Sequence, residues 1–215
     1  AKSISRSKPI VLLKAGRSSA GARAVSSHTG SLAGSYAAYQ AAFKQAGVIE
    51  VNTVNDLFDV AMYLDFLPVP SGKRAVIITN AGGPAALASD SLSANGFTLE
   101  DLQPESRETL RQNLTPAAQV GNPVDMLGGA EPKDYEMAVR ALLKDQNVDI
   151  VLPILVPQSL VDPAQVAQAI VDASKDSKKP VVSCIMGDFS VNEARIVLQG
   201  NRMPMFAYPE SMGVS

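Results

Sequence analysis

The stretch RAVIITNAGGPAALASDSLSA, residues 74–94, decides the fold class of this chain. Its first six residues form an apolar run of the length of a buried strand. The segment NAGGP, residues 80–84, predicts a turn, and residues 85–94 predict a helix that ends at Asn95-Gly96. A strand, a glycine turn and a helix in this order make one unit of an α/β fold.

Similar units extend in both directions from this stretch. Strands are predicted at residues 9–14, 48–51, 149–155, 181–186 and 205–207. Helices are predicted at residues 36–46, 53–66, 104–114, 132–145, 162–175 and 191–198. Residues 15–35 and 119–130 are expected to be loops. Short strands separated by such helices predict a parallel sheet with helices on both faces.

The segment LPVPSG, residues 67–72, is the best linker in the chain because it combines two prolines with a glycine. We therefore expect a first unit at residues 1–68 and a second at residues 72–215. Ligands of doubly wound α/β folds bind at the carboxyl ends of the strands. The glycine-rich loops that follow predicted strands are therefore the candidate sites.

Composition excludes several classes of protein. The 215 residues are 46% hydrophobic and 19% charged, with a net charge of −2, so nothing favours binding to nucleic acid or to an acidic membrane surface. No apolar run reaches the ~18 residues of a membrane span, and no signal peptide is visible, so the cytoplasm is expected. The polar start AKSISRSK without an initiator Met predicts a processed chain, a subunit or a fragment.

The loop Ser26-Ser27-His28-Thr29-Gly30 contains the single histidine of the sequence. Small residues and glycine let backbone N–H groups approach an anion, and the helix predicted next would direct its N-terminus at the loop. A neutral imidazole is a good nucleophile near pH 7. The pattern favours His28 as a phosphoryl acceptor with Ser27, Thr29 and Gly30 around the phosphate. A histidine that only caps or packs the loop is the alternative.

Other chemistry is less compatible with this histidine. A metal site is not expected, because there is no second histidine and the lone cysteine, Cys184, is far away in sequence. Cys184 lies in the apolar run VVSCIM and is interpreted as a small buried hydrophobic residue. A Ser-His-Asp hydrolase is not supported, because no G-x-S-x-G elbow is present.

Two further loops are candidates. In the first, Ala81, Gly82 and Gly83 precede a predicted helix and would expose its free N–H groups to an anion, although a turn needed only for packing is equally compatible. The second is NPVDMLGG, residues 122–129. Its Asp125 is a candidate general base and equally a candidate for an Asx turn or a helix cap.

Taken together, these loops resemble the NDP-forming acyl-CoA synthetase family, which comprises the ADP-forming acetate–CoA ligases related to succinyl-CoA synthetase. The resemblance covers nearly the whole chain. Four stretches carry it: KPIVLLKAGRSSAGARAVSSHTGSLAGS, QAGVIEVNTVNDLFD, VIITNAGGPAALASD and GNPVDMLGG. The first is the most specific of the four.

The resemblance implies an acid–thiol ligase that interconverts acyl-CoA, ADP and phosphate with a carboxylic acid, CoA and ATP. An acyl phosphate and a phosphohistidine are its intermediates, and His28 matches the phosphorylated residue. The helix after Ala81-Gly82-Gly83 matches one of two helices whose N-termini hold the phosphohistidine. Asn122, Val124, Asp125 and Gly128 match a segment on the acyl-substrate side.

The resemblance also implies the architecture and the partners. We expect two flavodoxin-like ligase units, the first incomplete, that work with a CoA-binding domain and an ATP-grasp domain or subunit. CoA, ATP or ADP and Mg²⁺ would belong to the complete enzyme, and none would be bound wholly within this chain, which alone is expected to be inactive. The incomplete first unit predicts an oligomer or a dependence on further domains. The alternative is a CoA- or acyl-CoA-sensing regulatory domain of a fused acetyltransferase.

Overall fold

The computed structural model describes residues 2–29 and 35–213, without the side chains of His28 and Thr29. The chain divides into two compact units, Ala1–Asp65 and Phe66–Ser215. The division falls immediately before the proline-containing segment 67–72. Each unit is built around its own sheet.

The second unit is organised around a six-stranded sheet of order β4-β5-β3-β6-β7-β8. Its strands are β3 (Ala75–Thr79), β4 (Gln119–Val120), β5 (Val124–Asp125), β6 (Ile150–Leu155), β7 (Ser183–Ile185) and β8 (Met205–Phe206). All neighbouring strands pair in parallel, except that β4 runs antiparallel to β5. The predicted α/β fold is therefore confirmed, with one antiparallel strand at the edge of the sheet.

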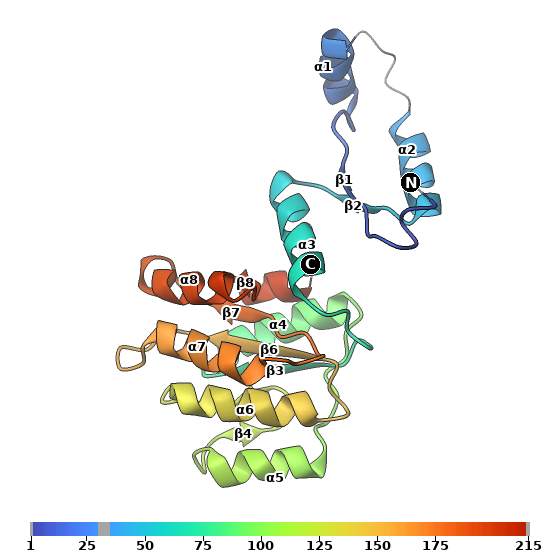
Figure 1. The fold of residues 1–215 in the computed structure, drawn as a ribbon. Helices are drawn as coiled ribbons and strands as arrows, with labels where there is room; N and C mark the ends of the chain where they lie inside the picture. Colours follow the sequence, from blue (N-terminus) through green and yellow to red (C-terminus); the bar gives the residue numbers. More distant parts are fainter. Residues whose placement is uncertain (1, 30–34, 214–215) are drawn as a thin grey trace. The chain divides into compact units, whose positions relative to one another are not determined.

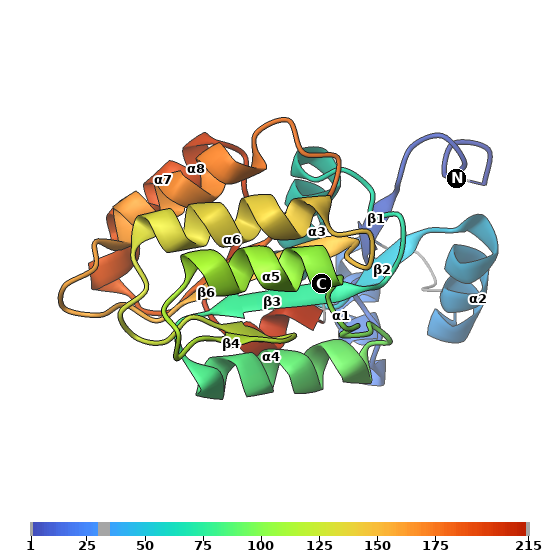
Figure 2. The same ribbon diagram turned by 90° about the horizontal axis from the view of Figure 1, so that it is seen from below.

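Helices cover both faces of this sheet. They are α4 (Gly82–Ala94), α5 (Pro104–Asn113), α6 (Pro132–Lys144), α7 (Pro163–Ser174) and α8 (Asn192–Gly200), with short 3₁₀ turns η1 (Phe189–Val191) and η2 (Pro209–Gly213). Figure 2 shows β3 between α4 on one side and α5 and α6 on the other. On the latter side α6 packs against α7, and α7 against α8 (Figure 1).

The helices begin where local chemistry favours it. A proline is the first residue of α5, α6 and α7, where its missing N–H breaks no helical hydrogen bond. Glu131 and Asp134 form a capping box at the start of α6, and the Asp162 side chain accepts from the Ala164 N–H at the start of α7. These starts agree with the predicted helices to within a residue.

The core of the second unit lies between the sheet and the helices. Every residue of β3 and β6 is buried, as expected for strands covered on both faces. Helix α6 buries Tyr135, Ala138, Val139 and Leu142, which fall on one face at helical spacing. Each large apolar side chain buried in this way contributes roughly 1.5–3 kcal/mol to folding.

The first unit is much smaller. It contains β1 (Val11–Leu13), α1 (Ser19–Thr29), α2 (Tyr36–Ala46), β2 (Ile49–Val51) and α3 (Val54–Phe66), and β1 pairs with β2 in parallel. Gly47 ends α2 in the left-handed conformation at φ 64°. At the start of α3, the Thr53 hydroxyl accepts from the Asp56 N–H and the Asp56 carboxylate accepts from the Thr53 N–H.

Three predictions of local structure were wrong. Residues 15–35 were expected to form a loop, yet α1 occupies Ser19–Thr29, because Ala20, Ala22 and Ala24 are strong helix formers among the glycines and serines. Helix α4 starts at Gly82 rather than at residue 85, since Pro84 is tolerated in a first turn. The expected loop 119–130 contains β4 and β5, which are too short to give a periodic pattern.

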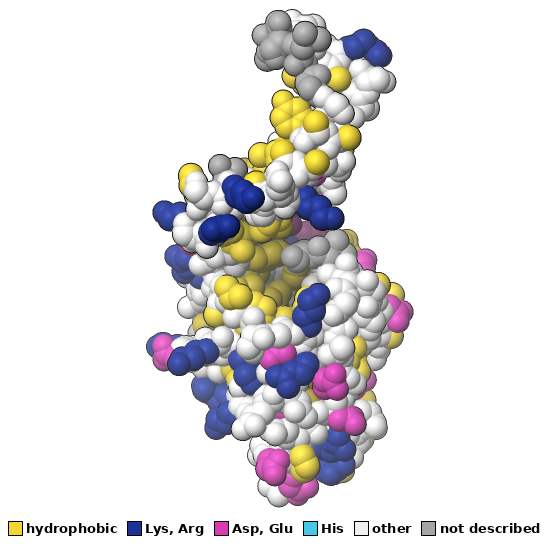
Figure 3. All heavy atoms as spheres, turned by 90° about the vertical axis from the view of Figure 1, so that its right-hand side faces the viewer, with side chains coloured by type: hydrophobic (Ala, Val, Ile, Leu, Met, Phe, Trp, Pro, Cys, Tyr) yellow, Lys and Arg dark blue, Asp and Glu magenta, His cyan; other side chains and the backbone are white. Residues whose placement is uncertain are grey.

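Charged side chains are distributed without a strong bias. On the lower part of the face seen in Figure 3, Lys and Arg side chains are interspersed with Asp and Glu, and no continuous patch of one sign forms there. This pattern agrees with the net charge of −2. Within the described residues, no helix is both long enough and apolar enough to cross a membrane.

Candidate functional site

Two of the predicted loops meet at the carboxyl edge of the second sheet. Thr79, the last residue of β3, pairs with Asp125 of β5 on one side and with Ile154 of β6 on the other. The start of α4 therefore lies beside the loop that follows β5. The two loops are far apart in sequence, and the pairing of β3 with β5 brings them together.

No side chain of the described residues caps the first turn of α4. Its N-cap is Ala81, which has no side chain to accept from the N–H groups of the first turn. The buried Thr79 hydroxyl accepts from the Ala81 N–H at 3.0 Å and so fixes the approach to the helix. Free N–H groups and the positive end of the helix dipole favour an anion at this point.

Asn80 joins this turn to the next loop along the edge, and the sequence analysis missed it. Its side-chain amide donates to the Val156 carbonyl at 2.8 Å and accepts from the Val156 N–H at 2.9 Å. The residue is 3% exposed, so both hydrogen bonds are made away from water. An asparagine directly after a buried strand is the sequence signal that could have suggested it.

Asp125 presents its two carboxylate oxygens to different neighbours. Oδ1 accepts from the Leu127 N–H at 3.0 Å, which is the Asx turn considered as one of its possible roles. Oδ2 points toward α4: a Cβ added to Gly82 would lie 3.3 Å from it. The pKa of Tyr135 is raised, first by burial and next by the negative charge of Asp125. The Tyr135 hydroxyl donates to the Ile154 carbonyl at 3.0 Å.

The other residues predicted on the acyl-substrate side lie in two different surroundings. Gly128 stays at the carboxyl edge, where an added Cβ would lie 3.9 Å from the Gln158 side chain of the loop after β6. The Val124 side chain is fully buried in the core. The Asn122 amide donates to the Ala75 carbonyl and accepts from the Ile77 N–H, both in β3. These contacts favour structural roles for Val124 and Asn122.

The remaining predicted phosphate-site residues belong to the first unit. Ser27 is exposed, and its hydroxyl donates to the Ala24 carbonyl at 2.8 Å. The backbones of His28 and Thr29 form the end of α1; their side chains, and all of Gly30, lie outside the described residues. A helix C-terminus carries the negative end of the dipole. Stabilisation of a phosphate on His28 would therefore have to come from other groups.

An arginine links the carboxyl ends of both strands in the first unit. Arg17 donates through Nε to the Lys14 carbonyl at 2.9 Å and through its two terminal nitrogens to Asn52 and to the Val51 carbonyl. Lys14 directly follows β1, while Val51 and Asn52 lie at the end of β2. Arg17 therefore fixes the chain two residues before α1 begins.

Cys184 and the groups that could bind a metal ion are the other candidates for chemistry. Cys184 is fully buried in β7, and burial raises the pKa of its thiol to about 12, so the prediction of a small buried hydrophobic residue is confirmed. Within the described part of the chain, no group of three or more His, Cys, Asp and Glu side chains is arranged to hold a metal ion.

Comparison with known protein families gives two matches. Residues 1–64 match the succinyl-CoA ligase-like flavodoxin domain, and residues 75–215 match the Ligase-CoA domain. The second match alone covers more than half of the chain. The chain belongs to the Ligase-CoA domain family. The resemblance found in the four sequence stretches is thereby confirmed.

Two curated relatives align with nearly the whole chain. The alpha subunit of an ADP-forming acetate–CoA ligase II from Pyrococcus furiosus is 40% identical over 100% of this chain and 48% of its own length. An ADP-forming acetate–CoA ligase I from Archaeoglobus fulgidus is 42% identical over 97% of this chain and 29% of its own length. The Ligase-CoA chain thus spans half or less of these relatives.

A solved structure has the same fold. It is the dinucleotide-forming acetyl-coenzyme A synthetase 1 of Candidatus Korarchaeum cryptofilum in complex with phosphate and ADP. The TM-score is 0.90 at 36% sequence identity, over 99% of this chain and 46% of the other. The α/β fold with a mostly parallel sheet is shared, and the structural match extends over both units of the Ligase-CoA chain.

Proposed function

We propose that this chain is part of an ADP-forming acyl-CoA ligase and that His28 carries the phosphoryl group between reaction steps. One observation carries the proposal: the relatives that align with 97–100% of the chain are ADP-forming acetate–CoA ligases. Since both are ligases, the regulatory alternative is not favoured. The substrate that supplies the acyl group is a small carboxylic acid, and the enzyme acts in the cytoplasm.

The proposed reaction proceeds in three steps. Phosphate attacks the acyl carbon of acyl-CoA, and the thioester bond breaks to give an acyl phosphate and CoA. A ring nitrogen of His28 then attacks phosphorus, a P–N bond forms, and the carboxylate leaves with the electrons of the P–O bond. An ADP oxygen finally attacks the phosphohistidine, which gives ATP and returns the neutral imidazole.

The second unit supplies the anion site in this proposal. The first turn of α4 at Ala81-Gly82-Gly83 has free N–H groups, and the Cβ-free face of Gly82 leaves room for the Asp125 carboxylate. A helix N-terminus favours an anion by roughly 0.3–1 kcal/mol at an exposed site and up to ~2 kcal/mol when partly buried.

The remaining components belong to partner domains or subunits. In this proposal CoA and the nucleotide bind outside the described residues, and Mg²⁺ accompanies the nucleotide rather than a site on this chain. The 215-residue chain alone would then be phosphorylated poorly or not at all and would not turn over. The complete enzyme is required for any test of activity.

The decisive experiment is to detect the phosphohistidine in the complete enzyme. The enzyme is incubated with ATP and Mg²⁺ in one sample and with acyl-CoA and phosphate in another. Peptides are then examined by mass spectrometry under alkaline handling, because phosphohistidine is labile in acid. We expect phosphate on His28 from both directions, and we expect His28→Ala to abolish turnover.

A matched variant separates chemistry from folding. Lys44→Ala alters an exposed helix residue of the same unit and should leave phosphorylation and turnover unchanged. Circular dichroism should give the same spectrum for both variants. If His28→Ala retains normal turnover, or if no phosphate appears while nucleotide and CoA still bind, the proposed role of His28 is wrong.

A further inference from the structure

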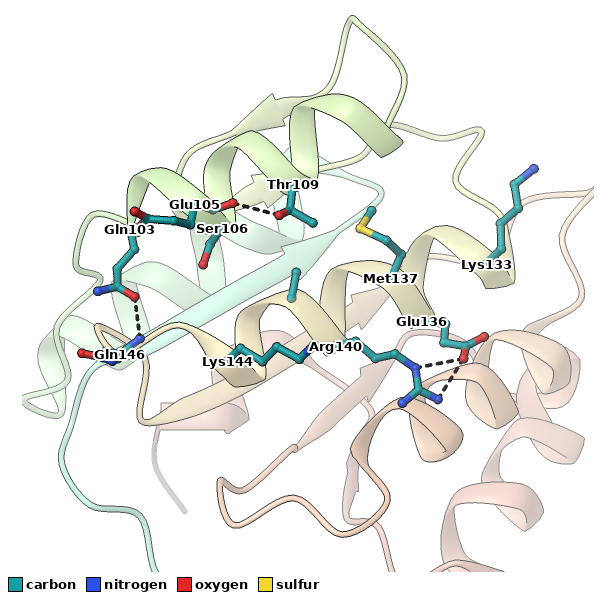
Figure 4. A pocket seen from close by; sticks show the side chains of 11 residues that line it. Gln103, Glu105, Ser106, Thr109, Lys133, Glu136, Met137, Arg140, Lys144 and Gln146 are labelled. Atoms are coloured by element: carbon teal, nitrogen blue, oxygen red, sulfur yellow. Dashed lines mark hydrogen bonds and ion pairs between the residues drawn. The ribbon is translucent and has the colours of Figure 1, made fainter.

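A groove lies between α5 and α6 of the second unit, away from the carboxyl-edge site. It encloses about 780 Å³, within the range of about 300–1,000 Å³ typical of small-molecule sites. It is lined by Gln103, Glu105, Ser106, Thr109, Lys133, Glu136, Met137, Arg140, Ala141, Lys144 and Gln146. Figure 4 shows these side chains, which come from the two helices and from the residues next to their ends, around a common space.

The Ser106 hydroxyl is an available hydrogen-bond donor on the wall of this groove. Ser106 is only 8% exposed, lines the groove from the first turn of α5, and directs its oxygen toward α6 (Figure 4). Among the residues that the structure describes, this hydroxyl makes no hydrogen bond, and its oxygen is open to solvent in the groove. It can therefore donate to a ligand bound in the groove.

The charges of the lining show what kind of ligand fits. Arg140 pairs with Glu136 at 2.9 Å, and Lys133 pairs with Glu131 at 2.7 Å, so these cations are already compensated. Lys144 has no ion pair with any residue in the described part of the chain. Its ammonium group therefore remains available for an anion at the same end of the groove as Ser106.

A second donor is fixed at that end. The Gln146 N–H donates to the Oε1 atom of Gln103 at 3.1 Å, while the NH₂ group of Gln103 makes no hydrogen bond to the described residues and can donate. In Figure 4 the Glu105 carboxylate points away from Lys144, so it does not occupy the anion position. Ser106, Gln103 and Lys144 together provide a neutral O–H, an amide N–H and an ammonium group, the donors that bind a carboxylate or phosphate group.

The groove also has an apolar surface. It is formed by Met137 and Ala141 of α6, which are half-buried and line the groove. Small-molecule sites combine such an apolar surface with a few polar groups that fix orientation. We propose that the α5–α6 groove binds a small amphiphilic anion, with its carboxylate or phosphate group on Ser106 and Lys144 and its apolar part on Met137. This inference is independent of the proposed function.

The test uses the 215-residue chain labelled with ¹⁵N and titrated with phenyl phosphate, benzoate and neutral benzyl alcohol. We expect the two anions, but not the alcohol, to shift the backbone amide resonances of Ser106 and Lys144. The anion that binds with the higher affinity identifies the ligand as a phosphate ester or as a carboxylic acid. Inorganic phosphate, which lacks the apolar part, should bind more weakly than phenyl phosphate.

Two variants and two controls locate the binding. Ser106→Ala should weaken the binding of the better anion about fivefold, and Lys144→Gln about tenfold. Ser93→Ala and Lys178→Gln make the same chemical changes at exposed positions outside the groove and should leave binding unchanged. The proposal is overturned if neither anion shifts the groove resonances, if benzyl alcohol binds equally well, or if both groove variants bind like the wild type.

Discussion

At the scale of single residues, Asp149 shows how a buried charge is accommodated. The residue is 2% exposed, and its carboxylate accepts from the Arg74 guanidinium at 2.8 and 2.9 Å, from the Arg74 N–H at 3.0 Å and from the Ser71 hydroxyl at 2.9 Å. The Arg74 side chain holds the pKa of this carboxyl well below its usual range. The group thus ties the residues before β3 to the start of β6.

Replacement of this carboxylate should destabilise the second unit. We expect Asp149→Asn to lower the free energy of unfolding at pH 7 by about 1.5–3 kcal/mol, because hydrogen bonds to a charged group are lost in a buried position. Urea unfolding followed by circular dichroism measures the change. Asp101→Asn is the control, since Asp101 is almost fully exposed and its ion pair with Arg107 is long, at 3.7 Å. An equal effect of both substitutions would contradict the role of Asp149.

The same residue predicts the direction of a pH dependence. Its pKa is lower in the folded state than the value of 3.8 expected in the unfolded state. The unfolded state therefore takes up a proton first as pH falls. The stabilisation is complete above about pH 5 and declines progressively below about pH 4, toward the lower pKa of the folded state. The difference in stability between wild type and Asp149→Asn should shrink between pH 5 and pH 3. A constant difference over that range would exclude this linkage.

At the scale of elements, the sequence is informative where a pattern is long. The runs RAVIIT and DIVLPIL became β3 and β6 because consecutive apolar residues of that length fit a strand covered on both faces. Strands β4 and β5 have two residues each and carry no period. Helix α1 was missed because glycine and serine obscured three alanines. Local sequence therefore predicted the framework but not its shortest parts.

The candidate site residues could also be selected from local sequence, whereas their arrangement in space could not. Gly82 and Asp125 were both selected from their own loops, yet their proximity arises from the pairing of β3 with β5, which no local pattern encodes. Asn122 was selected for the same loop as Asp125, but its amide is used by the backbone of β3. The Ser106 groove results from two helices whose first residues are separated by 28 positions in sequence, so only the packed structure reveals it.

The start of α4 allows a matched pair of substitutions. A Cβ on Gly83 would meet nothing within 4 Å, whereas a Cβ on Gly82 would lie 3.3 Å from the Asp125 carboxylate. Gly83→Ala should stabilise the second unit by about 0.4–1 kcal/mol, because alanine restricts the unfolded chain. Gly82→Ala should gain less and should lower the rate of the proposed His28 phosphorylation in the complete enzyme about tenfold, since a small displacement at the proposed anion site is costly.

Thermal unfolding and single-turnover phosphorylation measure the two effects separately. Because both variants replace glycine by alanine in the same helical turn, differences in helix propensity cancel between them. Equal phosphorylation rates in the two variants would mean that the space between Gly82 and Asp125 has no role in the reaction.

At the scale of the whole molecule, the two units differ in how much apolar surface they bury. Among the described residues of the first unit, Val51 is the one buried hydrophobic residue, and α2 and α3 bury none. Phe58 of α3 is 69% exposed. The second unit has a continuous core between its sheet and helices. Since burial of apolar surface is the main favourable term in folding, the two units should differ strongly in stability.

Hydrogen exchange of the 215-residue chain provides the measurement. We expect amides of β3 and β6 to be protected for hours or longer, because they open only with global unfolding of the second unit, and amides of β1, β2 and α2 to exchange within minutes, because little buried surface holds them. In the complete enzyme the first unit should become protected, since further domains would cover Phe58 and its neighbours. Uniform protection in the isolated chain would show that the first unit is stable without them, and the expectation of an incomplete unit would then be wrong.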